Sequence, residues 1–274
     1  MKPVPFTHEI PKSLQLADKA LTGDNSKVMA GGQSIGPMLN LRLVRPTTIV
    51  SIDQLDELQT VHIKGDVLSI GAAVTHAQIE DGIDDVDLPT MLRHVARSIA
   101  YRAVRNKGTI GGSLAHADPA ADWVSAMTAL GAQLVIRNAH GKSRREPMAG
   151  FMRGAYRTAL QQGDIIVAVE LPTAMGKALW GYEKICRKVG EFADAIGAVV
   201  IQPDLKYARI VVGATEDAPL LLDDMAREMA RTATAPSLDE IDGALAAHLP
   251  GASRVKRQLL KTALSRAIAK VIPS

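Results

Sequence analysis

The chain contains a single cysteine, Cys186, among its 274 residues. One cysteine excludes an internal disulfide, and it also excludes an iron–sulfur cluster or a cysteine-only zinc site, each of which takes about four thiolates. The seven histidines are scattered, and no His-x-x-x-His pair lies beside an acidic residue, so the sequence does not indicate a metal site. Redox chemistry in this chain would therefore need an organic cofactor, and we interpret Cys186 as a small packed residue.

Aromatic residues and net charge are also scarce. Phenylalanine, tryptophan and tyrosine together make up 3% of the chain, which argues against a stacking platform for single-stranded nucleic acid. Basic residues outnumber acidic ones by only 32 to 29, and a net charge of +3 is too small for a surface that tracks a phosphate backbone. The sequence therefore predicts no nucleic-acid partner.

Long apolar runs are missing as well. The first eleven residues contain three prolines and no stretch that could serve as a signal peptide. No segment approaches the roughly 18 consecutive apolar residues of a membrane-spanning helix. We therefore expect a cytoplasmic protein with no membrane span.

Helices and strands alternate through the first 176 residues. Apolar residues at helical spacing predict a helix over 8–23, and alternating apolar residues on either side of 64–66 predict a β-hairpin. An apolar segment between Pro119 and Gly131 predicts a helix that begins at Pro119 and is capped by Asp118. Further strands are expected in 27–30, 47–52, 133–146 and 164–172, and further helices in 75–82 and 88–100.

The pattern changes near residue 177. Three apolar segments, 178–189, 195–201 and 206–215, predict a three-stranded meander, and three helical stretches follow it. We therefore expect an α+β fold in two domains, with residues 1–176 in the first and 177–274 in the second. The chain is long enough for each domain to bury its own core.

Two glycine pairs stand in similar surroundings, "AGGQS" at 30–34 and "TIGGS" at 109–113. Glycine lets the backbone approach a ligand closely, and consecutive N–H groups form an anion-binding concavity. Neither motif fits Gly-x-Gly-x-x-Gly or the Gly-x-x-x-x-Gly-Lys phosphate loop. The N–H groups of Gly31–Ser34 and Ile110–Ser113, with the hydroxyls of Ser34, Thr109 and Ser113, predict two opposed nests that would suit a pyrophosphate.

These motifs carry a resemblance to a known family. The segment "AGGQSIGPMLNLRLVRPTTIVSI", followed by "TIGGSLAHADPAADW", resembles the FAD-binding medium subunit of molybdenum hydroxylases, the carbon monoxide dehydrogenase and xanthine dehydrogenase group. The similarity continues through "DIIVAVELP" and "GYEKICRKVGEFADA". It implies a vanillyl-alcohol-oxidase-type, two-lobed FAD-binding domain, with lobes at about 1–53 and 54–176, followed by a small α+β domain with a three-stranded antiparallel sheet.

The resemblance also implies a set of residues around non-covalently bound FAD. Both glycine segments would surround the pyrophosphate and ribityl chain, Asp122 would hold the adenosine side or its ribose, and Lys184 would reach the flavin. The chain departs from its relatives at Gln33, where histidine is frequent, and at Ser113, where asparagine is common; both residues keep hydrogen-bonding capacity. The implied cofactor residues are Ala30, Gly31, Gly32, Gln33, Ser34, Ile35, Ile99, Thr109, Ile110, Gly111, Gly112, Ser113, Asp122, Ile166 and Lys184.

Several of these residues also allow simpler interpretations. Asp122 could stabilise the N-terminal dipole of the helix that follows it, and Lys184 could be a solvated residue on a strand edge. His116 could act as an acid or a base, although a single histidine in a loop is more often structural. The sequence leaves these alternatives open, and it indicates no catalytic residue in this chain.

The resemblance further implies partners. An iron–sulfur small subunit with [2Fe-2S] clusters and a molybdopterin large subunit would join this chain in a dimer of heterotrimers. Electrons would pass from the clusters through FAD to NAD, a quinone or oxygen, and the segment 114–122 is the predicted docking surface. The alternatives are a self-sufficient FAD-dependent oxidase or dehydrogenase of a small substrate, and a scaffold or nucleotide-sensing module without turnover. The sequence does not fix the substrate of the complex or its electron acceptor.

Overall fold

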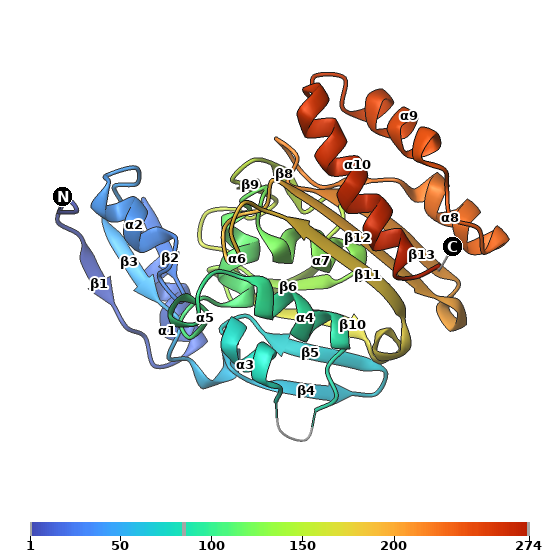
Figure 1. The fold of residues 1–274 in the computed structure, drawn as a ribbon. Coiled ribbons are helices and arrows are strands. Elements are labelled where there is room, and N and C mark those ends of the chain that lie inside the picture. Colours follow the sequence, from blue (N-terminus) through green and yellow to red (C-terminus); the bar gives the residue numbers. More distant parts are fainter. Residues whose placement is uncertain (1, 84–85, 273–274) are drawn as a thin grey trace.

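A parallel three-stranded sheet, in the order β1-β3-β2, forms the N-terminal part of the molecule. The structure is a computed structural model that describes residues 2–83 and 86–272. This part lies to one side of the rest of the chain and is coloured blue in Figure 1. Its elements are β1 (Thr7–Glu9), α1 (Leu14–Leu21), β2 (Ser26–Met29), α2 (Ile35–Asn40) and β3 (Thr48–Ser51).

A five-stranded antiparallel sheet, in the order β4-β5-β10-β6-β7, forms the middle of the molecule. Five helices and a small hairpin, β8–β9, belong to the same part of the chain (Figure 1). The strands are β4 (Val61–Lys64), β5 (Val67–Gly71), β6 (Gln133–Arg137), β7 (Ser143–Pro147), β8 (Met152–Gly154), β9 (Arg157–Thr158) and β10 (Ile165–Pro172). The helices are α3 (His76–Asp81), α4 (Thr90–Ser98), α5 (Arg102–Arg105), α6 (Ile110–His116) and α7 (Asp122–Ala129).

The C-terminal sheet has four antiparallel strands, in the order β11-β12-β13-β14. One face shares a core with α4 and α7, and the other face packs on α10, so β12 is buried along its whole length (Figure 1). The elements are β11 (Leu179–Ile185), β12 (Ala195–Gln202), β13 (Tyr207–Gly213), β14 (Leu220–Leu221), α8 (Asp223–Thr232), α9 (Leu238–His248) and α10 (Arg254–Ala269).

Three predicted elements differ from the structure. The helix expected over 8–23 begins only at Leu14, after its cap Ser13, because residues 7–9 pair with β3 as strand β1. The helix expected from Pro119 begins at Asp122; the Asp118 carboxylate instead accepts a hydrogen bond from the Ala120 N–H in the preceding turn, at 2.8 Å. The C-terminal meander has a fourth strand, β14, which is too short to give a periodic signal.

Short 3₁₀ turns complete the connections, at Asp56–Leu58, Thr173–Lys177 and Pro203–Leu205. Within residues 2–83 and 86–272, no helix has the length and apolar character needed to cross a membrane.

Candidate functional site

A cavity of about 760 Å³ lies where the N-terminal sheet meets the middle of the molecule. Its lining comes from the turn after β2, the segment between α4 and α5, helix α6, and the ends of β10 and β11. Sites for cofactors and small ligands have volumes of roughly 300–1,000 Å³. The cavity is therefore large enough for a cofactor. It brings together residues as far apart in the chain as Leu21 and Phe192.

The cavity contains nearly all of the predicted cofactor residues. The exception is Ile110, on the first turn of α6, whose side chain is fully buried in the main core. Its role in binding the cofactor stays a prediction. The predicted residues that line the cavity are Ala30, Gly31, Gly32, Gln33, Ser34, Ile35, Ile99, Thr109, Gly111, Gly112, Ser113, Asp122, Ile166 and Lys184.

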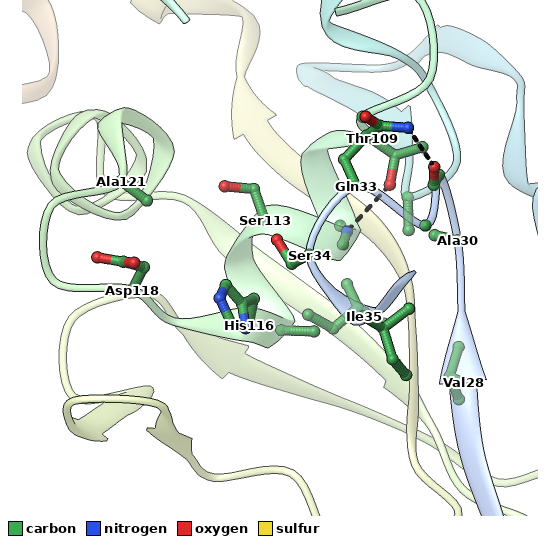
Figure 2. A pocket seen from close by; sticks show the side chains of 18 of the residues that line it. Val28, Ala30, Gln33, Ser34, Ile35, Thr109, Ser113, His116, Asp118 and Ala121 are labelled. Atoms are coloured by element: carbon green, nitrogen blue, oxygen red, sulfur yellow. Dashed lines mark hydrogen bonds between the residues drawn. The ribbon is translucent and has the colours of Figure 1, made fainter. Parts of the chain in front are cut away.

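The first glycine motif forms a tight turn with free backbone donors. Gly32 has φ +70°, a conformation that side chains with a Cβ rarely adopt, and a Cβ on Gly31 would lie 1.7 Å from the Lys107 carbonyl oxygen. Among the described residues, no acceptor receives a hydrogen bond from the backbone N–H groups of Gly31–Ser34. The Gln33 side chain folds back onto the turn and donates to the Gly31 carbonyl at 3.1 Å (Figure 2). The turn therefore offers consecutive donors, as predicted.

The second glycine motif is the first turn of helix α6, and its backbone donors are not free. The N–H groups of Ile110 and Gly111 donate to the carbonyls of Val74 and Ala72, each at 3.0 Å. The next two N–H groups donate to the cap residue Thr109, to its hydroxyl at 3.1 Å (Figure 2) and to its carbonyl at 3.0 Å. The four N–H groups of the predicted nest at Ile110–Ser113 therefore already have acceptors within the protein, and the role of this segment in cofactor binding stays a prediction. Gly111 is needed for packing, since a Cβ there would lie 2.4 Å from that of Ala72.

Asp122 and Lys184 form a buried ion pair at the edge of the cavity. Lys184 Nζ donates to one carboxylate oxygen of Asp122 at 2.8 Å, and the Tyr182 hydroxyl donates to the other at 2.7 Å. The side chain of Lys184 is only 8% exposed, so its interpretation as a solvated edge residue was wrong. Burial, together with the Asp122 carboxylate, raises the pKa of Tyr182, which keeps the hydroxyl protonated as a donor.

The position of Asp122 also supports its interpretation as a residue that stabilises a helix dipole. It is the first residue of α7, where a carboxylate stabilises the helix dipole, and it lines the cavity as well. Ser98 donates a further hydrogen bond to it at 3.3 Å. One carboxylate thus connects α7, β11 and the end of α4 at the cavity wall.

His116 and Asp118 lie at another part of the cavity, together with Tyr156. The Tyr156 hydroxyl donates to the Asp118 carboxylate at 3.1 Å, and its ring lies 5.2 Å from the imidazole of His116. Burial lowers the pKa of His116, so the imidazole is neutral at pH 7. Figure 2 shows His116 and Asp118 in the cavity wall with Ser34 and Ser113. Part of the segment 114–122 lines the cavity, and the remaining role that we predicted for it, as a docking surface, stays a prediction.

Sequence reasoning missed several lining residues. Tyr101, Tyr156 and Phe192 are 58%, 59% and 66% exposed and all line the cavity. Their rarity in a chain that is 3% aromatic was a signal that could have identified them. His76 is also part of the lining; it is buried, and its Nδ1 accepts a hydrogen bond from Trp123 at 3.0 Å. This contact joins residues 47 positions apart, so no local pattern could have predicted it.

Comparisons with known proteins agree on one family. The family described as the FAD binding domain in molybdopterin dehydrogenase matches residues 5–174. The carbon monoxide dehydrogenase medium chain of Hydrogenophaga pseudoflava is 34% identical over 226 residues, covering 81% of this chain and 78% of its own. The caffeine dehydrogenase subunit beta of Pseudomonas sp. (strain CBB1) is 32% identical and covers 80% of this chain and 76% of its own.

Solved structures give the same result over nearly the full length. Quinoline 2-oxidoreductase from Pseudomonas putida 86 matches with a TM-score of 0.85 and 29% identity, over 99% of this chain and 98% of that one. Carbon monoxide dehydrogenase from Hydrogenophaga pseudoflava, in a form that lacks the Mo-pyranopterin moiety, matches with a TM-score of 0.86 and 29% identity over the same shares. The resemblance inferred from the two glycine motifs is confirmed: the chain belongs to the family of FAD-binding medium subunits of molybdenum hydroxylases, which are oxidoreductase subunits.

Proposed function

We propose that the chain binds FAD non-covalently in the 760 Å³ cavity and transfers electrons from iron–sulfur clusters of a partner subunit to an external acceptor. The observation that carries this proposal is the turn Gly31–Ser34, whose four backbone N–H groups lack an acceptor among the residues that the structure describes. Consecutive free N–H groups bind anionic oxygens. Because the same cavity also contains an apolar wall and a buried lysine, it suits a ligand with both a diphosphate and a planar ring.

The residues fit FAD in three respects. The turn Gly31–Ser34 would hold the diphosphate, with the Ser34 and Ser113 hydroxyls as further donors. Ile99 and Ile166 would provide an apolar wall for the ring, which excludes water from it. Lys184 would donate a hydrogen bond to the cofactor while Asp122 holds its ammonium group in place.

FAD, when bound, supplies the capacity to accept and release electrons, and the protein supplies position and electrostatics. The Asp122–Lys184 pair places a positive group beside the cavity without leaving an unpaired buried charge. The remaining predicted residues, Ala30, Ile35, Thr109, Gly111 and Gly112, would shape the walls around the cofactor. Substrate hydroxylation would take place in a partner molybdenum subunit.

The proposed assembly follows from the relatives. Two of them are named as a medium chain and as a subunit beta, which implies further subunits in those proteins. We propose that this chain likewise joins an iron–sulfur small subunit and a molybdopterin large subunit in a dimer of heterotrimers. FAD would lie between the lobes 1–53 and 54–176 of a first domain, with residues 177–274 as a second domain.

Co-expression with the two partner subunits tests the electron-transfer role. We expect a stable complex in which FAD is reduced anaerobically by the substrate of the molybdenum subunit, whereas the chain alone with the same compound keeps its oxidised flavin spectrum. Reduction of FAD in the isolated chain by that compound would contradict the proposal and favour a self-sufficient oxidase or dehydrogenase. A chain that purifies and remains without flavin in excess FAD would contradict both.

A further inference from the structure

The segment between α4 and α5 forms one wall of the cavity in an unusual conformation. Ile99, Ala100 and Tyr101 all line the cavity. Ala100 has φ +43°, in the left-handed region that costs free energy for any residue with a Cβ. This conformation persists only if other contacts hold it.

Arg105 supplies those contacts from the first turn that follows the segment. Its Nη1 donates to the carbonyl oxygens of both Ile99 and Ala100, at 3.0 and 2.9 Å. These two carbonyls belong to the peptide groups on either side of the Ala100 Cα atom. Lys184 Nζ reaches the preceding carbonyl, that of Ser98, at 3.3 Å, so cationic groups hold three consecutive carbonyls of this wall.

Glu80 on α3 fixes the guanidinium in turn. Arg105 Nε and Nη2 donate to its two carboxylate oxygens at 2.7 and 3.2 Å. Both side chains are mostly buried, at 12% and 15% exposure. A planar guanidinium has five N–H donors in a fixed arrangement and can make these four hydrogen bonds at once, whereas a lysine ammonium has only three donors and cannot.

We propose that Arg105 and Glu80 are positioning residues for the cofactor: they hold the left-handed turn at Ala100 and thereby set the place of the Ile99 wall beside the flavin. This inference rests on the proposed function, because it assigns the ring of FAD to this wall. Neither residue lines the cavity, so they act through the backbone rather than by contact with the ligand.

The neighbouring Arg102 offers a matched control. It also pairs with Glu80, at 3.0 Å, and with Asp81, yet its side chain is 48% exposed, and none of its hydrogen bonds within the described residues reaches the carbonyls of the wall. If Glu80 acted only through its charge, substitution of either arginine would affect FAD binding to a similar extent. A positioning role makes only Arg105 important for the cofactor.

The experiment compares R105K and R102K in the full chain. We expect R105K to bind FAD on the order of tenfold more weakly, the factor that corresponds to the loss of about one hydrogen bond to a charged group, and to shift the midpoint potential of the bound flavin. R102K should match the wild type in both. Adding A100G to R105K should restore much of the FAD affinity, because glycine adopts the left-handed turn without strain, whereas A103G on helix α5 should not.

A second measurement keeps the two proposals separate. Amide hydrogen exchange of residues 98–101 in the cofactor-free chain should be faster in R105K, or in E80Q if R105K does not fold, than in the wild type and R102K. Unchanged exchange, or unchanged FAD affinity and potential in R105K, would overturn the positioning role while leaving FAD binding intact. A wild-type chain that binds no FAD would refute the proposed function, and faster exchange in R105K would then show only that Arg105 holds this turn.

Discussion

His76 shows how burial makes a single residue sensitive to pH. Burial and, second, the charge of Arg105 lower the pKa of this imidazole from 6.5 to about 4. Above pH 6.5 the group is neutral in both the folded and the unfolded chain. Between pH 6.5 and 4 the unfolded chain binds the proton more readily, so the free energy of unfolding decreases as the pH falls.

The expected size of this effect can be checked by substitution. The interval from 6.5 to about 4, at about 1.4 kcal/mol per pH unit, gives about 3 kcal/mol. We expect His76→Gln to lose this part of the pH dependence, and exposed His140→Gln to keep it. Urea unfolding of the cofactor-free chain between pH 4 and 7 measures the free energy of unfolding at each pH. If this free energy depended on pH equally in His76→Gln and the wild type, His76 would not be the source of the effect.

Gly32 tests the first glycine turn, where the free donors lie. Gly32→Ala places a Cβ on a residue with φ +70°, which should disturb the turn by about 1–2 kcal/mol and weaken FAD binding on the order of tenfold. Gly65→Ala is the matched control, because Gly65 has φ +62° in the hairpin between β4 and β5 and does not line the cavity. Fluorescence titration with FAD should separate the two variants, and equal affinities would remove the turn from the cofactor site.

Gly111 should behave differently from Gly32, although the two motifs look alike in sequence. A Cβ on Gly111 would lie 2.4 Å from the Ala72 Cβ and 2.8 Å from its carbonyl oxygen, so Gly111→Ala should destabilise the fold by about 1–3 kcal/mol. Gly243→Ala, in helix α9 with open space around it, should stabilise the chain by about 0.5–1 kcal/mol. Thermal unfolding of the cofactor-free variants checks both, and an unchanged melting temperature for Gly111→Ala would contradict the packing role.

At the scale of elements, two tyrosine hydroxyls join helix α7 to the C-terminal sheet, Tyr182 from β11 and Tyr207 from β13, and their hydrogen bonds differ in strength. Tyr182 donates to the buried Asp122 carboxylate, whereas Tyr207 donates to the neutral carbonyl of Ala129 at 2.7 Å. Hydrogen bonds to charged groups contribute about 1.5–3 kcal/mol and neutral ones about 0.5–1.5 kcal/mol. Tyr182→Phe should therefore destabilise the chain more than Tyr207→Phe, and only Tyr182→Phe should weaken FAD binding, through Asp122 and Lys184. Denaturant unfolding measures the stability of the two variants, and titration with FAD measures their affinity. Similar losses of stability and affinity in the two variants would argue against a buried charged network.

Local patterns predicted some elements well and others poorly for a common reason. The hairpin around Gly65 and the helix capped by Thr75 follow from turn and capping chemistry within a few residues. Strand β1 depends instead on pairing with β3, some forty positions away, and the first turn of α6 depends on the carbonyls of Ala72 and Val74. A glycine pair gives no sign of whether its N–H groups face a ligand or a neighbouring strand.

At the scale of the whole molecule, the sequence predicted which residues share a site better than how each one acts. The order and spacing of the two glycine motifs led to the family, which the comparisons confirm. The lining of the cavity by Lys184 and Asp122 was implied by that resemblance, but their mutual hydrogen bond and its link to Tyr182 were not. The Arg105–Glu80 support of the cavity wall carries no sequence signal, because the ion pair joins side chains 25 positions apart and the same guanidinium donates to backbone carbonyls, which no residue type marks.

The most direct test of the central claim is the absorption spectrum of the purified chain, measured before and after acid precipitation. We expect a flavin spectrum from the native chain, and we expect the flavin to appear in the supernatant after precipitation and to be identified there as FAD. A colourless chain that takes up no FAD, or flavin that stays with the precipitated protein, would contradict the account of a non-covalent FAD-binding subunit.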